Sequence, residues 1–440
     1  MTPRPLRVLH VVHDYFPAIG GSELLFQHVG EGLAARGMHV SVFTSTAKRT
    51  SDFVGGDNDR FAAGQEEING VYVRRFDYRR FSATTRLILT TASSAWTRRR
   101  WRGYGWLKAV WVGPHLPGLV REAVRLKPDL IAATAAPFMP IYRALEAGRR
   151  LGVPVAIMPC LHPGDEWLLD SPSLFTLLRR ADAVLTLTPY ENQLLQAIGL
   201  DPRRLHLLGG GVSPASPAAA EKGLRERFGI PLDAPLVLFC GRMEEGKGVL
   251  TVVEAMARLW QVGHSAGLVL AGAATQFSNA SLARALAHLP GEWRRHIIVR
   301  NDITEGEKWG WYGECDVLAH PSRIESFGLV YLEAWVCGKP VIGGRTGPQA
   351  SLITHGRDGL LVRPGDVEEL VDALRLILSD RARAAAFGAE GRAKVMQHHT
   401  WDCVVDRAAA IYSALARARA GAATPSWSSE AIDPRSHAGL

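Results

Sequence analysis

Short apolar segments alternate with helical stretches along most of the chain, and this alternation constrains the fold more than any other feature of the sequence. Residues 6–12 form an apolar run, apolar residues then recur at helical spacing up to Gly37, and residues 40–43 form a second run. Further apolar runs, separated by helical stretches, occupy residues 130–133, 153–158 and 183–187. This order predicts a parallel β-sheet covered by helices on both faces.

A comparable series begins again in the second half of the chain. Its apolar runs occupy residues 236–240, 268–271, 297–299, 317–319 and 341–342. A chain of 440 residues is long enough for two domains of ordinary size, each with its own core. The sequence therefore predicts an α/β protein with two doubly wound, Rossmann-like domains.

The connection between the two domains is predicted within residues 209–223, whose Gly, Pro and Ala content breaks both periodicities. We expect an N-terminal domain over residues 1–212 and a C-terminal domain over residues 213–399. A last helix is predicted over residues 400–420, with Thr400 as its N-cap. The final segment, residues 421–440, is rich in Ser, Pro and Ala and is expected to be disordered.

Composition and charge indicate a globular protein with an anionic partner. No apolar run reaches the roughly 18 residues that span a bilayer, and no signal-peptide cleavage pattern is present, so we expect a cytoplasmic location. The five cysteines are widely spaced and form no C-x-x-C pair, which is typical of buried thiols in a reducing compartment. A net charge of +8 favours a phosphorylated substrate, an acidic membrane or nucleic acid, and does not choose among them.

Two glutamates, Glu325 and Glu333, stand eight positions apart around the start of an apolar helix. The backbone amides of residues 327–330 lie in the first turn and have no partners within the helix, so they suit a phosphate. The flanking carboxylates suit sugar or ribose hydroxyls; for each glutamate taken singly, the alternative is that Glu325 caps the helix and Glu333 is an ordinary charge on it. The helix is otherwise apolar around Glu333, and a buried carboxylate there needs a partner, which a ribose diol would supply.

Two cations, Arg242 and Lys247, follow the first strand of the predicted C-terminal domain in the segment CGRMEEGKG. Ligands of open α/β sheets collect at the carboxyl ends of the strands. Arginine supplies a bidentate fork and lysine a point charge, so the pair is suited to a diphosphate. A solvated loop with ordinary surface charges is the alternative for these two residues alone, and the later glutamate pair favours the diphosphate site.

Three positions in the N-terminal half are candidates for contact with a ligand. His162 directly follows the strand predicted at residues 153–158, at the sheet edge that would face a substrate held by the second domain, and a purely structural histidine is the alternative. Gly20 and Gly21 either bring backbone amides close to a ligand or make the turn into the first helix. Asp165 and Glu166 are secondary candidates for holding an acceptor.

Two other patterns are interpreted as structural. The sequence Asp57-Asn58-Asp59 resembles a metal-binding D-x-D motif, but no apolar strand leads into it, and we interpret it as a surface loop. The run of glycines at residues 209–211 does not match the G-x-G-x-x-G fingerprint of dinucleotide sites. We therefore expect neither a metal nor a cofactor.

The main charge asymmetry of the chain lies in residues 74–108, which contain ten basic residues and one acidic residue interleaved with aromatic side chains. Basic residues with Trp and Tyr suit the headgroup region of an anionic membrane. The same composition could bind nucleic acid, or could belong to a solvated insertion.

With these motifs in place, the chain resembles the retaining glycosyltransferases of family four, which have the two-domain GT-B fold with a cleft between the domains. The resemblance runs from about residue 5 to 415. It is carried by the E-x7-E pattern with the following GKPVI, by the GR...K pattern, and by PxxGGxE at residues 17–23. The interdomain NGVD of many members reads GGVS here, and the acidic residue often found after the second glutamate is absent from GPQASLI.

The resemblance implies a role for each matching residue. Arg242 and Lys247 would hold the donor diphosphate, Glu325 would contact the sugar, and Glu333 would bind the ribose. His162 matches the histidine that family members place beside the anomeric carbon. Residues 301–303 match the loop that touches the base, and the terminal helix at residue 401 looks like the one that crosses back onto the first domain. The expected donor-binding set is completed by Gly20, Gly21, Asp302, Ile303, Ser326, Phe327, Gly328 and Leu329.

We therefore expect a metal-independent, retaining glycosyltransferase that moves a hexose-like unit from a UDP- or GDP-sugar to a glycan, a lipid-linked or another hydroxyl acceptor. Such a reaction belongs to cell-surface polysaccharide or glycolipid biosynthesis, and residues 74–108 would place the enzyme on the inner face of a membrane. The alternatives are a non-catalytic nucleotide-sugar sensor or scaffold on a membrane, a basic nucleic-acid-binding protein, and an epimerase or phosphorylase of the same fold. The phosphate and sugar motifs favour the transferase.

Overall fold

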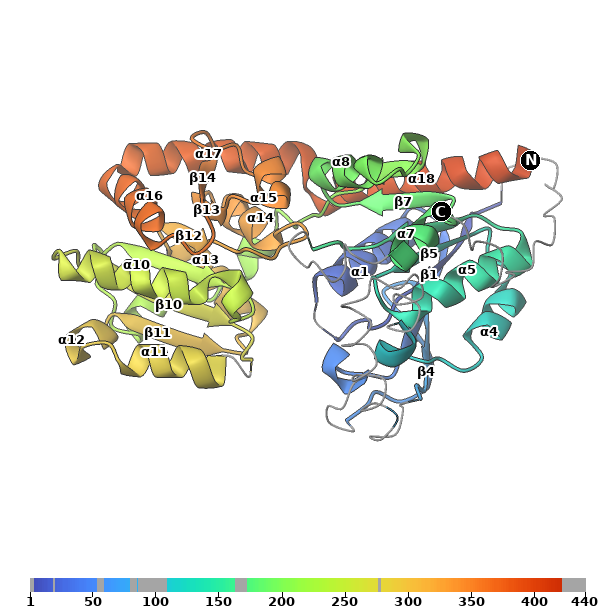
Figure 1. Ribbon diagram of the computed structural model, residues 1–440, viewed down its shortest axis with the longest axis horizontal. Coiled ribbons are helices and arrows are strands. Elements are labelled where there is room, and N and C mark those ends of the chain that lie inside the picture. Colours follow the sequence, from blue (N-terminus) through green and yellow to red (C-terminus); the bar gives the residue numbers. More distant parts are fainter. Residues whose placement is uncertain are drawn as a thin grey trace, which may run out of the picture.

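The computed structural model describes residues 4–18, 20–53, 59–79, 85, 109–162, 172–275 and 278–421. Two α/β lobes lie side by side (Figure 1). Helix α17 (Arg381–His398) runs along the C-terminal lobe, and helix α18 (Trp401–Gly421) continues along the N-terminal lobe. Each lobe is built around one β-sheet, and the predicted fold class of two Rossmann-like parallel-sheet domains is confirmed. The exact boundary at residue 212 stays a prediction.

The sheet of the N-terminal lobe has the strand order β3-β4-β2-β1-β5-β6-β7-β8. All neighbours pair in parallel except β3, which pairs antiparallel with β4 at the edge. The predicted strands are present, and three further strands, β3, β4 and β8, were not predicted. The strands are β1 (Arg7–Val11), β2 (His39–Ser45), β3 (Gly64–Ile68), β4 (Val71–Phe76), β5 (Leu130–Thr134), β6 (Val155–Met158), β7 (Ala183–Thr186) and β8 (Leu205–Leu207).

The sheet of the C-terminal lobe is parallel throughout, with the order β11-β10-β9-β12-β13-β14. Its predicted strands are present, and the short strand β14 was missed. The strands are β9 (Leu236–Cys240), β10 (Gly267–Gly272), β11 (Ile297–Asn301), β12 (Val317–His320), β13 (Val341–Gly344) and β14 (Gly359–Val362).

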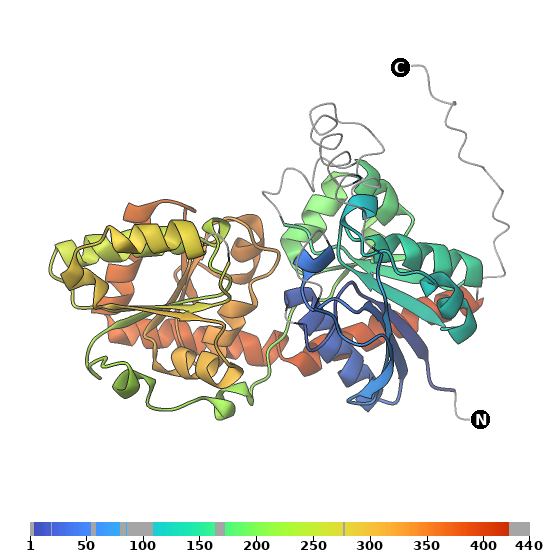
Figure 2. The ribbon, with the colours of Figure 1, turned by 90° about the horizontal axis from the view of Figure 1, so that it is seen from below.

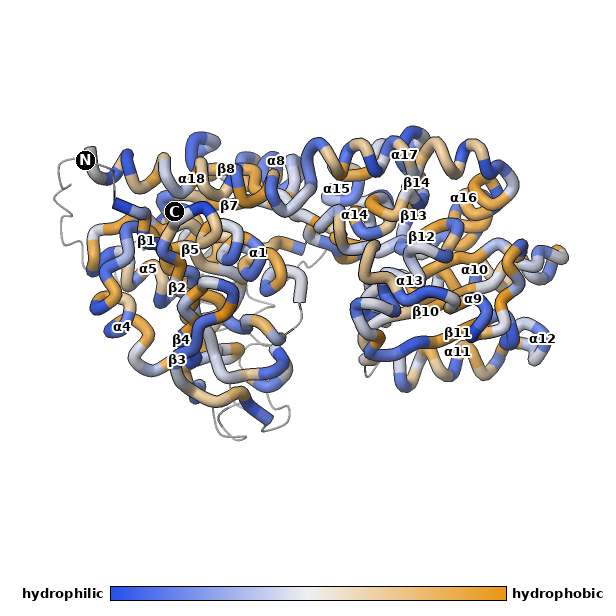
Figure 3. The backbone as a smooth tube through the Cα atoms, turned by 180° about the vertical axis from the view of Figure 1, so that it is seen from behind, coloured by the Kyte–Doolittle hydropathy of each residue, from blue (hydrophilic) through white to orange (hydrophobic). Residues whose placement is uncertain are grey.

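Helices cover both faces of each sheet, and the central strands are therefore buried on both sides. All five residues of β5 and of β9 are buried, which explains why these strands read as continuous apolar runs. The hydropathy-coloured tube shows hydrophobic residues along the central strands, whereas the edge strands β3 and β11 carry hydrophilic stretches (Figure 3). The remaining α-helices are α1 (Gly21–Ala35), α4 (Leu119–Leu126), α5 (Met139–Leu151), α7 (Pro172–Arg179), α8 (Pro189–Ala197), α9 (Leu224–Arg227), α10 (Val249–Gln261), α11 (Ala283–Ala287), α12 (Gly291–Arg294), α13 (Glu305–Glu314), α14 (Leu329–Val336), α15 (Gly347–Leu352) and α16 (Val367–Ser379).

The chain passes between the lobes twice, and the two crossings pair with each other. The amide of Val212 donates to the carbonyl of His399 at 2.9 Å, and the amide of Trp401 donates to the carbonyl of Val212 at 3.3 Å. The hydroxyl of Thr400 accepts from the amide of Cys403 at 3.2 Å and so caps α18. These bonds hold the two crossings as one connection.

Helix α18 lies against α1 of the N-terminal lobe, as the view from below also shows (Figure 2). Arg36 at the end of α1 forms ion pairs with Asp402 and Asp406 of α18, and Trp401 stacks on His28 with ring centroids 4.3 Å apart. The C-terminal helix therefore packs on the first lobe. Residues 422–440, expected to be disordered, lie outside the described residues. Within the described residues, the structure has no helix with the length and apolar character that a membrane span needs.

Candidate functional site

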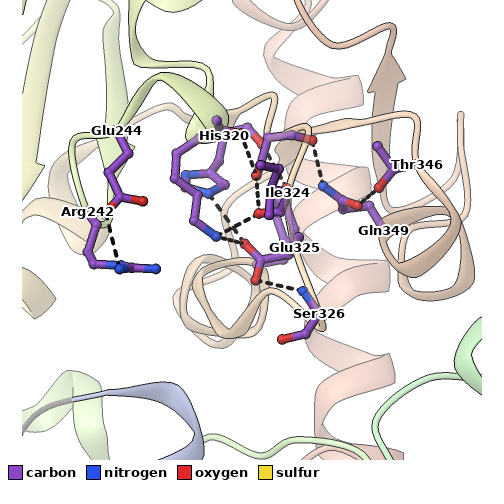
Figure 4. Close-up of polar contacts among 12 residues, drawn as sticks. Arg242, Glu244, His320, Ile324, Glu325, Ser326, Thr346 and Gln349 are labelled. Carbon is purple, nitrogen blue, oxygen red and sulfur yellow. Dashed lines mark hydrogen bonds and ion pairs between the residues drawn. The ribbon is translucent and has the colours of Figure 1, made fainter. Parts of the chain in front are cut away.

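A buried ion pair lies at the carboxyl edge of the C-terminal sheet. After β9, the chain makes a short 3-10 turn, Glu245–Lys247, and Gly248 leaves it with φ +82. The Nζ atom of Lys247 donates to Oε2 of Glu325 at 2.9 Å and to the carbonyl of Ile324 at 2.9 Å (Figure 4). The two side chains are 12% and 13% exposed. The structure thus brings together two of the residues that the sequence placed in a donor site.

The charges of this pair are fixed by its surroundings. Burial alone would raise the pKa of Glu325, but the ammonium of Lys247 and the imidazole of His320 hold it far below its usual range. His320 is buried and stacks on Phe239, and burial lowers its pKa. Its Nε2 atom lies 3.7 Å from Oε2 of Glu325. Glu325 therefore stays ionised near neutral pH, and His320, which the sequence did not single out, is a third member of the cluster.

The turn after Glu325 presents unpaired backbone amides. The amide of Ser326 donates to Oε1 of Glu325 at 3.2 Å, whereas the amides of residues 327–330 have no acceptor among the described residues. Helix α14 starts directly afterwards at Leu329, and its N-cap, Gly328, has φ +98. A Cβ atom on Gly328 would also meet the ring of Tyr331 at 2.5 Å. The glycine is thus required for a turn that can accept an anion through amides and the helix dipole.

Arg242 lies on the same loop as Lys247 but in a different environment. Its side chain is 61% exposed and forms an ion pair with Glu244 at 3.1 Å, apart from the Lys247–Glu325 pair (Figure 4). Of the two cations that the sequence grouped together, Lys247 is therefore buried and Arg242 is exposed.

The buried carboxylate of Glu333, on the second turn of α14, has two protein partners. Lys308 donates to its Oε1 atom at 2.9 Å, and the hydroxyl of Tyr312 donates to Oε2 at 2.8 Å. Lys308 also pairs with Glu305 at 3.0 Å. Lys308 and Tyr312 are four residues apart on α13, so they share one face of that helix. The sequence analysis did not single out Lys308 or Tyr312. Their i, i+4 spacing was the pattern that could have indicated a shared polar face. A ribose is not needed to satisfy Glu333, and its role as a ribose ligand stays a prediction.

The loop predicted to touch a base follows β11 on the same sheet edge. Asp302 is exposed, has φ +51, and donates its amide to the carbonyl of Gly272 at 2.8 Å. Ile303 is half-buried and packs against the core. The loop is thus anchored by its backbone while the side chain of Asp302 remains accessible.

In the N-terminal lobe, the first helix begins with a buried cluster around Glu23. Oε1 of Glu23 lies 2.7 Å from Nε2 of His13, and both side chains are less than a tenth exposed. A Cβ atom on Gly20 would lie 2.1 Å from Oε2 of Glu23, whereas a Cβ atom on Gly21 would meet nothing within 4 Å. The first glycine of the motif is therefore needed to admit the Glu23 carboxylate, and the second stands in open space.

This contrast predicts different outcomes for two neighbouring substitutions. Gly20→Ala should lower the free energy of unfolding by about 1–3 kcal/mol, because the methyl group must displace a carboxylate that His13 holds in place. Gly21→Ala, its matched control, should leave stability unchanged or slightly raise it, because alanine favours the helix. Urea unfolding of the two variants measures the difference, and equal stabilities would refute the steric explanation.

The His13–Glu23 pair also predicts a pH dependence of stability. Burial opposes both charges, but each partner stabilises the other, so the pKa of His13 is raised and the pKa of Glu23 is lowered. The contribution of His13 is present below its ordinary pKa of 6.5 and is lost as pH rises through the raised value. The contribution of Glu23 is present above 4.5 and is lost as pH falls through the lowered value.

Stability relative to the double variant His13→Gln/Glu23→Gln should therefore be greatest between pH 4.5 and 6.5. Urea unfolding of both proteins across the pH range gives this difference, and a difference that keeps rising above pH 6.5 would contradict the assigned charges. Asp14 lies beside the pair, and burial raises its pKa to about 6. One ligand atom from each of these three side chains lies within 4.8 Å of the others, so the three could also ligate a metal. In the structure His13 pairs with Glu23, and Asp14 accepts from the hydroxyls of Ser45 and Thr50.

His162 lies in the loop after β6, at the carboxyl edge of the N-terminal sheet, and is half-buried. The preceding residue is held by Glu191, whose Oε1 atom accepts from the amide of Leu161 at 3.3 Å. Burial raises the pKa of Glu191 to about 7, although hydrogen bonds from Leu187 and Leu161 oppose the shift. Sequence reasoning missed Glu191, which stands three residues after Thr188 in a capping-box spacing. Asp165 and Glu166 lie outside the described residues.

The turn at Phe327 also touches the crossings between the lobes. A Cβ atom on Gly210 would lie 2.6 Å from the ring of Phe327, and this ring is 5.8 Å from that of His399. On the other side of the junction, the amide of Tyr190 donates to the hydroxyl of Ser351 at 3.2 Å. Loops from the carboxyl edges of both sheets therefore meet, and the candidate donor turn lies beside this meeting point.

Two further sequence features fall partly outside the described residues. Of the Asp57-Asn58-Asp59 pattern, only Asp59 is described, and it is exposed and forms an ion pair with Lys48 at 2.7 Å. Of the basic aromatic segment, residues 80–84 and 86–108 lie outside the described residues. Its membrane role stays a prediction.

Two family models match this chain and together cover both lobes. The model described as "Glycosyl transferases group 1" matches residues 221–394, which contain Arg242, Lys247, Glu325 and Glu333. The model described as "Glycosyl transferase 4-like domain" matches residues 20–211, which contain His162.

Curated relatives include several named glycosyltransferases. A D-inositol 3-phosphate glycosyltransferase of Xylanimonas cellulosilytica is 34% identical over 246 residues, which cover 54% of this chain and 57% of the relative. An alpha-maltose-1-phosphate synthase of Mycolicibacterium smegmatis is 30% identical over 54% of this chain and 64% of the relative. These matches thus span little more than half of each relative. A glycogen synthase of Mycobacterium tuberculosis is 26% identical over 94% of this chain and 95% of the relative.

Solved structures share the fold over nearly the whole chain. The Anabaena protein HepE, solved in complex with UDP and glucose, has a TM-score of 0.69 at 18% identity, covering 93% of this chain and 100% of HepE. A sucrose-phosphate synthase from Thermosynechococcus elongatus has a TM-score of 0.68 at 22% identity, covering 94% of this chain and 100% of the synthase. At these identities the likeness establishes the fold.

Proposed function

The chain belongs to the glycosyl transferases of group 1 with the GT-B fold, and from this membership we propose that it transfers a sugar from a nucleoside-diphosphate sugar to a hydroxyl acceptor with retained anomeric configuration. One observation carries the proposal. The buried Lys247–Glu325 pair adjoins a turn whose amides at residues 327–330 have no acceptor among the described residues. A cation and four amides favour a phosphate, and an adjacent carboxylate favours sugar hydroxyls.

The chemistry requires stabilisation of a departing diphosphate. In the proposed reaction, the bond from the anomeric carbon to the diphosphate oxygen breaks as the acceptor oxygen bonds to the same face of that carbon. The proton of the acceptor hydroxyl passes to the leaving phosphate oxygen. Lys247 and the start of α14 would hold the growing negative charge without solvent reorganisation, and one such donor can contribute about 3–4 kcal/mol to the transition state. Arg242 would join them after leaving Glu244.

The remaining donor contacts follow from the same sheet edge. Glu333 would bind the ribose, with Lys308 and Tyr312 fixing its carboxylate, and Asp302 and Ile303 would contact the base. His162 would reach the sugar from the N-terminal lobe and support the positive charge that develops on it through its backbone carbonyl. Gly20 and Gly21 would bring the backbone of that lobe close to the donor.

The names of the relatives and of the solved structures support a choice of donor. HepE is solved with UDP and with UDP-glucose, and one relative is named a GDP-mannose-dependent mannosyltransferase, so we propose a UDP- or GDP-sugar as the donor. The acceptor would be a glycan or lipid-linked hydroxyl compound of cell-surface glycan or glycolipid synthesis. The enzyme would act at the inner face of a membrane, with residues 74–108 as its contact to anionic lipid.

The test is nucleotide release from UDP- and GDP-sugars, followed with the intact protein and a panel of sugar and lipid-linked acceptors. Thermal shift with each donor identifies the base, because a bound ligand stabilises the native state by mass action. Acceptor-dependent release of UDP or GDP supports the proposal. Donor binding without release, in the presence of all acceptors, would instead favour a non-catalytic nucleotide-sugar sensor.

A further inference from the structure

We propose that the first turn of helix α8 positions the loop that carries His162 against the donor-binding half of the site, and that Glu191 is the positioning residue. The proposal rests on the proposed function, since it assigns a role to the loop of a candidate catalytic histidine. It is carried by two sets of contacts: Glu191 bonds to the loop of His162, and its neighbour Tyr190 contacts the C-terminal lobe.

Glu191 holds two separate chain segments through its carboxylate. Oε2 accepts from the amide of Leu187 at the end of β7 at 2.7 Å, and Oε1 accepts from the amide of Leu161, next to His162, at 3.3 Å. The side chain is 3% exposed. Among the described residues, no basic side chain forms an ion pair with it. A buried carboxylate is costly unless it is hydrogen-bonded, so a role beyond capping α8 explains why glutamate stands here.

Tyr190, the adjacent residue, makes the contact to the other lobe. Its amide donates to the hydroxyl of Ser351 on α15 at 3.2 Å. A Cβ atom on Gly347, the first residue of α15, would lie 2.3 Å from the ring of Tyr190. The ring therefore packs directly on the backbone of α15, which a larger residue at position 347 would prevent. One turn of helix thus bonds to the His162 loop on one side and to the C-terminal lobe on the other.

Helix α15 continues this connection to the donor turn. The side chain of Gln349 is buried and donates to the carbonyl of Ser322 at 2.8 Å. The hydroxyl of Ser322 donates to the carbonyl of Ile324 at 2.9 Å, and Lys247 bonds to the same carbonyl (Figure 4). An unbroken series of packed and hydrogen-bonded groups therefore links the amide of Leu161 to the Lys247–Glu325 pair. Its consequence is that His162 has a defined position relative to the donor.

The experiment compares Glu191→Gln with the wild-type protein in steady-state kinetics and in nucleotide binding. Glutamine keeps the shape but presents an N–H group to one of the two amides, so one bond is lost. We expect kcat to fall about tenfold to a hundredfold, because small misplacement of a reacting group has effects of this order. The donor KM and the Kd for UDP or GDP should stay within twofold, because no donor-binding residue has changed.

Asn192→Ala is the matched control. Asn192 lies on the same helix and accepts from the hydroxyl of Thr186 at 2.6 Å, so its loss perturbs α8 without touching Leu161. This variant should lose stability but keep kcat. Equal kcat in Glu191→Gln and the wild type, or equal losses of kcat in both variants, would overturn the positioning role.

Gly347→Ala perturbs the first turn of α8 from the C-terminal lobe, because the added methyl group would meet the ring of Tyr190. It removes no buried polar group. It should lower kcat at unchanged nucleotide affinity by displacing Tyr190, and it decides the question if Glu191→Gln does not fold. An unchanged kcat in a folded Gly347→Ala protein would then overturn the proposal. If the wild-type protein transfers no sugar, the proposed function and this inference are overturned together. If the wild-type protein is active and the variants keep its kcat, only this inference is overturned.

Discussion

Lys247→Ala is expected to lower sugar-nucleotide turnover by about 10²- to 10³-fold. Lys247 is the buried cation beside the turn that we propose binds phosphate, and loss of one preorganised donor to a developing anion has an effect of this size. Binding of UDP or GDP should weaken as well, since in the proposed site the same charge would face the ground-state diphosphate. Nucleotide-release kinetics and calorimetric binding measure the two effects.

Arg258→Ala is the control for this prediction. Arg258 lies on α10 of the same lobe, is 60% exposed, and only approaches Glu368 at 3.8 Å, so its removal should change neither turnover nor stability. Lys247→Ala leaves Glu325 without its main counter-charge, and circular dichroism melting must therefore show that the variant is folded at the assay temperature. Turnover within threefold of the wild type in a folded Lys247→Ala protein would remove the basis of the proposed function.

Glu333→Ala is expected to weaken donor binding and to destabilise the fold. The substitution leaves Lys308 buried with only the exposed Glu305 as an ionic partner, and it removes the carboxylate that accepts from the hydroxyl of Tyr312. Breaking a buried ion pair from one side costs about 3–5 kcal/mol, and the remaining contact with Glu305 places the expected loss at the lower end. Urea unfolding measures the stability, and calorimetry with UDP or GDP measures the binding.

A double variant separates these two effects. In Lys308→Met/Glu333→Leu, both charges are replaced by apolar groups of similar size, and such replacements of buried pairs are often neutral for stability. The double variant should therefore regain the stability that Glu333→Ala loses through the unpaired charge of Lys308, but not the hydrogen bond of the Tyr312 hydroxyl, while donor binding stays weak. Recovery of donor binding together with stability would show that Glu333 serves the fold and does not contact the nucleotide.

Most of the strands that the sequence predicted are buried on both faces, whereas the edge strand β11 was predicted from its apolar residues although it is only partly buried. The run Leu236–Cys240 is buried at every position, and a continuous apolar segment is readable without knowledge of its neighbours. β3, in contrast, has the sequence GQEEI and lies at the sheet edge, so its strand character depends on pairing with β4, which no local pattern reports. β14 is a buried apolar run, GLLV, of the same kind as the predicted strands, and the prediction missed it.

For the site, spacing in the sequence indicated Lys247, Glu325 and the turn between Glu325 and Glu333, because these residues follow strands or start a helix. It could not indicate their partners. Lys308 contacts Glu333 across 25 positions, and Glu191 contacts Leu161 across 30 positions. The sequence also grouped Arg242 with Lys247, whereas their exposure differs because only Lys247 turns back toward Ile324.

By itself, the sequence determined the fold class, the family resemblance and the candidate donor residues, since each depends on the order and spacing of residues along one segment. Only the tertiary structure decided which of these side chains are charged, buried and paired, because those properties depend on neighbours that the chain brings together from distant segments. Gly20 illustrates the difference. The motif marks the position, but the reason for glycine is the carboxylate of Glu23, which His13 at the end of β1 holds against it.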